Sequence, residues 1–223
     1  MDRAAFLARV REALAGSEPS EVTRGPELPA EFPRTPASGD GSPLVERFAR
    51  ELVAVGGVAQ MVGAGGVADA VAEEVRRLRA RGIVVATEDT DAFRDAVEAG
   101  VAKAGSELVR PGPDRWREVA ARADVGITSA FLGVASTGSV LVVPSAESPR
   151  VASILPAAHL VILPSDRLVP GLEEVMAALP ALADRSSAPF LVTGPSRTSD
   201  IEMTMVTGAH GPRAVSVVLV RSP

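Results

Sequence analysis

"VAQMVGAGGVADAVAEEVRRLRARGIVVA", residues 58–86, contains the pattern that decides the fold. Two short apolar runs, Val58 to Val62 and Ile83 to Ala86, stand on either side of a segment that repeats at helical spacing. The aligned apolar residues of that segment are Val67, Val71, Val75 and Leu78. Short apolar strands that alternate with amphipathic helices are typical of a largely parallel sheet covered on both faces. We therefore expect an α/β fold.

The same alternation continues from about residue 43 to the end of the chain. The expected helices lie at 43–55, 67–81, 90–99, 113–122, 149–154 and 171–179. The expected strands lie at 58–62, 83–86, 107–109, 124–128, 139–143, 160–163, 190–193 and 214–220. Together these elements predict one domain over residues 43–223.

The first 42 residues differ from this pattern. Phe6, Leu7, Val10 and Leu14 recur at helical spacing, so we expect an N-terminal helix within residues 1–16. Residues 17–42 carry five prolines and few large apolar side chains, which is typical of an extended linker. We expect the helix to be an appendage that packs on the main domain or on a partner chain.

Composition limits the function. Apolar residues make up 46% of the chain and aromatic residues 3%, so the core must consist mostly of Val, Leu, Ala and Ile. A net charge of −5 gives no electrostatic reason to expect nucleic acid as a partner. The absence of cysteine excludes disulfides, thiolate catalysis and Cys-ligated iron–sulfur clusters within this chain. Only Lys103 is a lysine, which leaves no phosphate-loop lysine.

No membrane span is expected, because no apolar run reaches roughly 18 residues. The charged N-terminal segment also lacks the apolar core of a signal peptide. We expect a soluble, cytoplasmic protein of bacterial type.

Ligands of parallel α/β folds bind where loops converge outside the carboxyl ends of strands. One such loop is "MVGAGGVADA", residues 61–70, in which Gly63, Gly65 and Ala68 match a dinucleotide-binding pattern. Glu88 and Asp89 follow the next strand, about where an acid could bind a ribose. The alternative is an ordinary turn of small residues. A short glycine motif is only weak evidence for a nucleotide site.

A second loop, "ASTGSVLVVPSAESPR", spans residues 135–150. Thr137, Gly138 and Ser139 can present hydroxyl and backbone donors to a carboxylate or phosphate, although such a triplet also suits an ordinary turn at the start of a strand. Arg150 could hold an anion, with a solvated surface arginine as the alternative.

The third loop, "TGPSRTSDIEMTMVTGAHGP", spans residues 193–212 between two strand-like runs. A short helix is expected at 200–206. Asp200, Glu202 and His210 could transfer protons or, with less support, share a metal. Helix capping and a backbone-bonded turn histidine are the structural alternatives. The coincidence of strand end, glycines and titratable groups favours a ligand site, whereas His159, at the start of an apolar strand, is interpreted as a structural histidine.

"GITSAFLGVASTGSVLVV" (126–143) and "TGPSRTSDIEMTMVTGAHGPRAVSVVLV" (193–220) resemble the LUD domain family, and within it the lactate utilisation protein C group. The resemblance runs from about residue 43 to the C-terminus. The matching motif positions are Thr137, Gly138, Ser139, Gly194, Pro195, Ser196, Asp200, Glu202, His210, Gly211 and Pro212. Ser136 is a departure, because the family often has an acidic residue before this Thr-Gly pair.

The resemblance implies a three-layer α/β/α fold similar to the sugar-phosphate isomerase and CoA-transferase superfamily. It also implies a role in oxidising L-lactate to pyruvate together with partner proteins that carry iron–sulfur clusters. A chain without cysteine fits that division, so no cofactor is expected in this chain.

The resulting hypothesis is a non-redox component of a lactate-oxidising complex that binds a small anionic ligand. Its ligand-binding residues would be Thr137, Gly138, Ser139, Arg150, Gly194, Ser196 and Arg197, on the loops 137–139, 145–150 and 194–210. His210, assisted by Asp200 or Glu202, would take the hydroxyl proton if chemistry occurs here, and no metal site is expected. The alternatives are an enzyme that acts alone on a CoA thioester or phosphosugar, and a non-catalytic structural or regulatory subunit.

Overall fold

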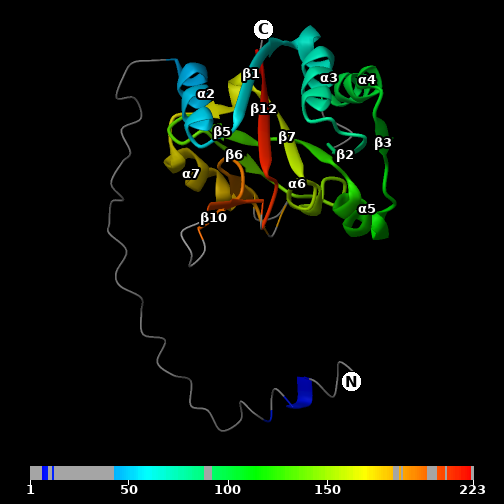
Figure 1. Ribbon diagram of the computed structural model, residues 1–223. Coiled ribbons are helices and arrows are strands. Elements are labelled where there is room, and N and C mark those ends of the chain that lie inside the picture. The colour runs from blue at the N-terminus through cyan, green and yellow to red at the C-terminus, as the bar shows by residue number, and fades with distance from the viewer. Residues whose placement is uncertain are drawn as a thin grey trace. The chain divides into compact units, whose positions relative to one another are not determined.

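The computed structural model describes residues 7–9, 12, 43–87, 92–182, 186, 188–199, 205–208 and 210–221 (Figure 1). Residues 7–9 and 12 are helical, in the segment where the N-terminal helix is expected. The expected linker at 17–42 lies outside the described residues.

The centre of the domain is a six-stranded sheet in which every neighbouring pair is parallel. Its strands, in spatial order, are β1 (Val58–Gly63), β12 (Ala214–Arg221), β7 (Ala158–Pro164), β4 (Val125–Ser129), β2 (Gly82–Ala86) and β3 (Glu107–Val109). The inner strands β4, β7 and β12 are buried along almost their whole length. Their apolar runs are therefore continuous rather than alternating, as the sequence predicts for a sheet with two covered faces.

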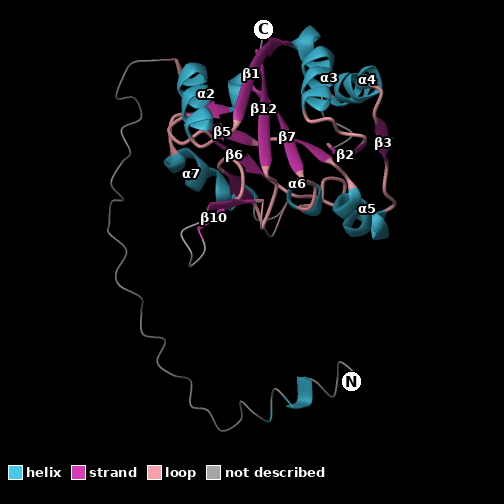
Figure 2. Cartoon of the chain, viewed as in Figure 1, coloured by secondary structure: helices cyan, strands magenta, loops and turns pink. Residues whose placement is uncertain are grey.

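Helices α3 (Val67–Arg77) and α4 (Arg94–Ala104) cover one face of this sheet (Figure 2). Val71, Val75, Val97 and Val101 of these helices are fully buried against sheet residues such as Leu160. At the outer part of this face Glu74 is 6% exposed and accepts two hydrogen bonds from the guanidinium of Arg77 and one from Ser216 Oγ. The strand–helix–strand expectation around residue 67 is confirmed.

The other face is covered in two parts. Helices α5 (Trp116–Arg122) and α6 (Val151–Ile154) pack over β2 and β4. A short η2 turn (Pro113–Arg115) leads into α5. Helix α2 (Leu44–Ala54) and a second sheet pack over β7 and β12, where Phe48 and Leu52 are buried with Val161, Leu163 and Val217.

The second sheet is smaller and mixed. Its spatial order is β8 (Leu168–Val169), β5 (Leu132–Val134), β6 (Ser139–Val142) and β9 (Phe190–Val192). β6 is antiparallel to both β5 and β9. Helix α7 (Leu172–Leu182) lies against this sheet, with Val175 and Leu182 packed on Val134 and Leu141 (Figure 2).

The sequence does not separate these two sheets. It places the runs at 139–143 and 190–193 in the same sheet as the other strands, whereas β6 and β9 belong to the small one. It does not predict β5 and β8 at all. A continuous apolar run is typical of a buried strand in either kind of sheet. The composition of such a run therefore does not predict which strand it pairs with.

The helix expected at 200–206 is also wrong where the structure describes it. Residues Arg197–Ser199 (β10) and Met205–Thr207 (β11) form an antiparallel pair. The remainder, residues 200–204, lies outside the described residues. Ile201 and Met205 stand four residues apart, which suits a helical face, but two residues at one spacing are also compatible with a hairpin.

Candidate functional site

Three hydroxyl groups form a connected chain at one end of the small sheet. Ser139 Oγ lies 2.7 Å from Thr137 Oγ1 and 2.7 Å from Thr193 Oγ1. The pairing of Val140 in β6 with Val192 in β9 brings these residues together, although Ser139 and Thr193 are far apart in sequence. Ser139 is 2% exposed, whereas Thr193 is exposed. Thr193 is not among the residues expected from the sequence.

The hydrogen bonds among these three hydroxyl groups leave one hydroxyl proton without an acceptor in the group. Each hydroxyl has one proton to donate, and two hydrogen bonds use two of the three protons. The remaining proton belongs to the hydroxyl that donates in neither bond: Thr193 or Thr137 when Ser139 donates to it, and Ser139 when both threonines donate to Ser139. A carboxylate next to that hydroxyl could accept it, so the arrangement can bind an anion as well as hold the strands together.

The glycines of both motifs have packing roles. Gly138 has φ 63°, and a Cβ on it would lie 2.2 Å from the backbone nitrogen of Leu52. Gly194 has φ 71°, and its Cβ would lie 2.8 Å from Cγ2 of Val55. Both turns therefore rest directly on the C-terminal end of α2. The left-handed backbone and the close packing on α2 each require glycine at these positions. The structure therefore explains both glycines without a bound ligand.

Arg197 reaches the same end of α2. Its Nη2 packs against Gly56, which lies directly after the helix. A Cβ added to Gly56 would be only 2.1 Å from this atom. The partial negative charge at a helix C-terminus favours a nearby cation. Arg197 as a residue is exposed, and a guanidinium can pair with a carboxylate through two parallel hydrogen bonds.

Backbone hydrogen bonds of Ser196 join the two ends of the loop at residues 194–212. Its amide donates to the carbonyl of Pro212 at 2.9 Å, and its carbonyl accepts from the amide of Gly208 at 2.9 Å. His210 lies in the exposed turn between those two contacts. Asp200 and Glu202 lie outside the described residues, so of the three expected catalytic residues the structure describes only His210.

Arg150 does not lie with the other expected ligand residues. Its Nη2 donates to the carbonyl of Ala188 at 3.0 Å, and its guanidinium carbon stands 5.3 Å from the centre of the Phe190 ring. Phe190 pairs with Val142 at the far end of β6 from Ser139, about 10 Å along the strand. Among the described residues, Arg150 therefore lies at the opposite end of β6 from Thr137, Ser139 and Thr193, with which the sequence groups it.

The position of the cluster relative to the large sheet also differs from expectation. The 194–213 segment leads into the amino end of β12, where the amide of Arg213 donates to the carbonyl of Ala157. Residues 193–194 do follow a carboxyl end, but it is that of β9 in the small sheet. The rule for parallel sheets therefore does not apply to this loop, because its preceding strand is outside the parallel sheet.

His159 is 1% exposed in β7, and its Nε2 lies 2.8 Å from Oγ1 of Thr128. Its Nδ1 has no hydrogen-bond partner among the described residues. Burial lowers the pKa of His159 to about 4, so the ring is neutral at physiological pH. This location in the core agrees with the interpretation of His159 as a structural histidine.

The strand order argues against a dinucleotide site at residues 63–68. β1, which precedes this turn, is an edge strand, and β2 lies four strands away, about 19 Å across the sheet. In the dinucleotide-binding pattern these two strands are neighbours, whereas here β12, β7 and β4 lie between them. Glu88 and Asp89 themselves lie outside the described residues. A Cβ added to Gly63 or Gly65 would have nothing within 4 Å, so packing does not demand glycine there either.

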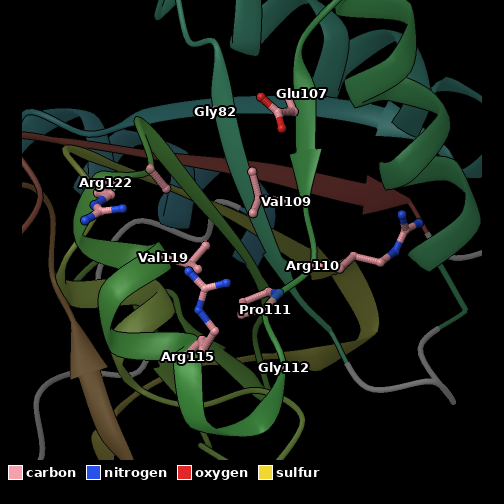
Figure 3. Close-up of a pocket in the computed structure, with 10 residues that line it drawn as sticks. Gly82, Glu107, Val109, Arg110, Pro111, Gly112, Arg115, Val119 and Arg122 are labelled. Carbon is pink, nitrogen blue, oxygen red and sulfur yellow. The ribbon is translucent and has the colours of Figure 1, made fainter.

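A groove of about 500 Å³ between β3 and α5 has no counterpart among the sequence-based expectations (Figure 3). It is lined by Gly82, Glu107, Val109, Arg110, Pro111, Gly112, Arg115, Val119, Arg122 and Ala123. Its three arginines already have acidic partners: Arg110 contacts Glu98 at 2.5 Å, and Arg115 and Arg122 both contact Glu118. These pairs neutralise the groove, so it is a weaker anion site than its arginines suggest.

Among the described residues, no group of three or more His, Cys, Asp and Glu side chains could hold a metal ion. Within the same residues no helix is both long and apolar enough to cross a membrane.

Comparison with known proteins agrees with this fold. The family model described as LUD domain matches residues 45–220. A protein from Exiguobacterium named lactate utilization protein C is 38% identical over 112 residues, which are 48% of this chain and 49% of that protein. The chain thus spans about half the length of this curated relative. A protein of the same name from Deinococcus radiodurans is 26% identical over 216 residues, covering 96% of this chain and 93% of that protein.

A solved structure shares the fold. The crystal structure of a DUF162 family protein from Deinococcus radiodurans has a TM-score of 0.57 and 21% sequence identity, and the match covers 79% of this chain and 96% of that one. The α/β architecture expected from residues 58–86 is confirmed. Since the family model matches most of the sequence, the chain belongs to the LUD domain family.

Proposed function

We propose that this chain is a component of an L-lactate utilisation system in which L-lactate is oxidised to pyruvate. The observation that carries the proposal is the alignment of nearly the whole chain with the Deinococcus relative named lactate utilization protein C. Membership of the LUD domain family supports it.

In this proposal the electrons of the oxidation leave through partner proteins. Conversion of L-lactate to pyruvate releases two electrons and two protons, so it requires an acceptor. The 223 residues contain no cysteine and therefore do not fit a thiolate-bound iron–sulfur cluster. Iron–sulfur partners would supply the acceptor, and this chain would bind the carboxylate ligand.

The proposed ligand position is the cluster of Thr137, Ser139, Thr193 and Arg197. The guanidinium of Arg197 would pair with the ligand carboxylate, and the uncommitted hydroxyl proton at Thr137 or Thr193 would donate to it. His210 would accept the proton of the ligand hydroxyl, with Asp200 or Glu202 assisting it, while the Cα–H bond breaks and its proton goes to solvent and the two electrons to the acceptor in the partner proteins. Arg150 is left out of this ligand set, because its contacts lie at the opposite end of β6 and β9.

A second candidate is a non-catalytic structural subunit of the same system. The specific observation in its favour is that Gly138 and Gly194 are required by their close packing on α2. The motif would then preserve the junction between α2 and the small sheet. His210 would have no chemical role.

The test is growth on L-lactate by a strain that lacks the gene and carries a plasmid copy. Loss of the gene is expected to abolish growth on L-lactate and to leave growth on pyruvate unchanged. Normal growth on L-lactate without the gene would refute the proposal. A His210→Ala copy separates the two candidates: it fails to restore growth if His210 moves a proton and restores it if the subunit is structural.

A biochemical version uses the co-purified complex. Lactate oxidation with an artificial electron acceptor is expected to need both this chain and its iron–sulfur partners. Turnover of a CoA thioester or a phosphosugar by the purified chain alone would instead identify a stand-alone enzyme.

A further inference from the structure

Helix α2 ends in a tight turn at Gly56 and Gly57. The amide of Gly56 donates to the carbonyl of Val53 at 2.9 Å. The amide of Gly57 donates to the carbonyl of Leu52, also at 2.9 Å. Gly56 has φ 85°, the left-handed conformation in which helices commonly end. This backbone favours glycine at residue 56 with or without a ligand.

The space beside Gly56 is filled by the charged group of Arg197. A Cβ on Gly56 would lie 2.1 Å from Nη2, 3.4 Å from Cζ and 3.9 Å from Nε of Arg197. All three atoms belong to the guanidinium, so the guanidinium itself packs against the glycine. Any side chain at residue 56 would therefore displace the guanidinium from its position.

The backbone of Arg197 is fixed by the loop that carries it. Arg197 pairs with Thr207 in the antiparallel ladder of β10 and β11. The preceding residue, Ser196, is hydrogen-bonded through its backbone to Pro212 and Gly208, at 2.9 Å in both cases. Arg197 is thus held at its backbone by this loop and at its guanidinium by the end of α2.

The guanidinium of Arg197 has no acidic partner in the part of the chain that the structure describes, and it makes no hydrogen bond there. Other arginines of the domain are paired with carboxylates, as Arg77 is with Glu74 and Arg110 is with Glu98. The partial negative charge at the C-terminal end of α2 attracts the guanidinium without supplying a carboxylate. A guanidinium that is held in place but unpaired is suited to bind the carboxylate of a ligand.

The same end of α2 also supports the chain of three hydroxyl groups. Gly138 and Gly194, which are next in sequence to these hydroxyl residues, both pack on residues 51–55. The guanidinium of Arg197 contacts Gly56, which is the following residue. One short segment of the chain therefore sets the position of the guanidinium relative to the hydroxyl groups.

We propose that Gly56 is a positioning residue for ligand binding: it leaves the space in which the end of α2 holds the Arg197 guanidinium, in the orientation that pairs with the ligand carboxylate. This inference rests on the proposed function, in which Arg197 binds that carboxylate. A guanidinium that is held before the ligand arrives loses less side-chain entropy on binding. Glycine at residue 56 then contributes to affinity for the ligand as well as to the end of the helix.

The first test measures the dissociation constant of L-lactate with the full chain by NMR titration. Gly56→Asn is the informative variant, because asparagine tolerates a left-handed backbone but its side chain fills the space of the guanidinium. It is expected to weaken L-lactate binding by at least ~10-fold, as the loss of a charged hydrogen-bonded pair does. Gly105→Asn is the matched control: Gly105 ends α4 with φ 74°, and nothing lies within 4 Å of its Cβ position. This control should bind L-lactate as the wild type does.

A double-mutant cycle determines whether Gly56 acts through Arg197. Arg197→Ala is expected to weaken L-lactate binding at least as much as Gly56→Asn. Adding Gly56→Asn to Arg197→Ala should cause no further loss, because the group that Gly56 positions is already absent. Losses that multiply in the double variant would overturn the proposal, since Gly56 would then affect binding by another route.

Chemical rescue supplies a readout that a purely structural glycine would not change. In Arg197→Ala the space beside Gly56 is empty, so ethylguanidinium at millimolar concentration is expected to restore part of the L-lactate affinity. Ethylammonium has the same charge but not the planar fork of donors, so it should not restore affinity. No rescue by ethylguanidinium, or equal rescue by both cations, would overturn the proposal. Circular dichroism melts report whether Gly56→Asn is folded, and if it is not, the rescue experiment decides.

The titrations separate failure of this inference from failure of the proposed function. A wild-type chain that does not bind L-lactate would refute the proposed ligand and the role of Gly56 with it. Binding that Arg197→Ala weakens and Gly56→Asn does not would refute only the role of Gly56. Binding that neither variant weakens would place the ligand away from Arg197 and would also refute the inference.

Discussion

Nε2 of His159 and Oγ1 of Thr128 lie 2.8 Å apart in the interior of the domain, and each residue is 1% exposed. Burial lowers the pKa of His159 to about 4, compared with 6.5 for the exposed group. The unfolded chain therefore binds a proton between these two pH values while the folded chain does not. Protonation then favours unfolding, so the stabilisation due to a neutral His159 is complete above pH 6.5 and is lost as the pH falls.

The first prediction follows from this pair. Between pH 7.5 and pH 5 the free energy of unfolding is expected to fall by about 2 kcal/mol through His159. Urea unfolding at the two pH values measures the difference. His159→Gln removes the titrating group and should lose most of this pH dependence. If the variant keeps the full dependence, another group is responsible.

A second prediction concerns Gly138. Gly138→Ala is expected to destabilise the fold by about 3 kcal/mol or more, because it combines a left-handed backbone with a Cβ only 2.2 Å from the backbone of Leu52. Gly105→Ala is the control: φ is 74°, but nothing lies within 4 Å of its Cβ position. That substitution should cost only about 1 kcal/mol. Equal losses in urea unfolding would show that α2 does not restrict the Gly138 turn.

The third prediction concerns the buried carboxylate of Glu74. Burial alone would raise the pKa of Glu74, but hydrogen bonds from Arg77 and Ser216 and the charge of Arg77 lower it overall. Glu74→Gln breaks the bidentate pair and is expected to cost about 1–2 kcal/mol, a value reduced by the partial exposure of Arg77. Glu73→Gln, on the exposed side of the same helix, should change stability by less than about 0.5 kcal/mol. The same small effect at Glu74 would contradict the structural role of this pair.

The large sheet is predictable from the sequence because each of its strands is a short apolar run that precedes or follows an amphipathic helix. Val71 and Val75 recur on one helical face, and that face is the one buried in the structure. The small sheet has no such signal. Its central contact, Ser139 with Thr193, depends on the pairing of β6 with β9, which are separated in sequence by two helices and two further strands.

The candidate site is predictable only in part for the same reason. Thr137 and Ser139 are close in sequence and lie together in the structure, whereas Thr193 escapes prediction because a single threonine after a strand has no distinctive pattern. Arg150 is grouped with them in the sequence because it follows the same strand. A loop at the other end of a strand is remote in space even when it is close in sequence.

The last prediction tests whether the hydroxyl chain binds a carboxylate or only joins β6 to β9. Thr193→Val has nearly the same shape but removes the hydroxyl that bonds to Ser139 Oγ. Thr193→Ser keeps the hydroxyl and serves as the matched control. If these hydroxyl groups bind the ligand carboxylate, Thr193→Val should weaken L-lactate binding about 5- to 10-fold, whereas Thr193→Ser should bind L-lactate as the wild type does. Titration of L-lactate followed by NMR measures both constants. Because Thr193 is exposed, a purely structural bond would lower the free energy of unfolding by about 1 kcal/mol and leave the lactate dissociation constant unchanged. Unchanged affinity in Thr193→Val together with measurable wild-type binding would place the ligand elsewhere on the domain.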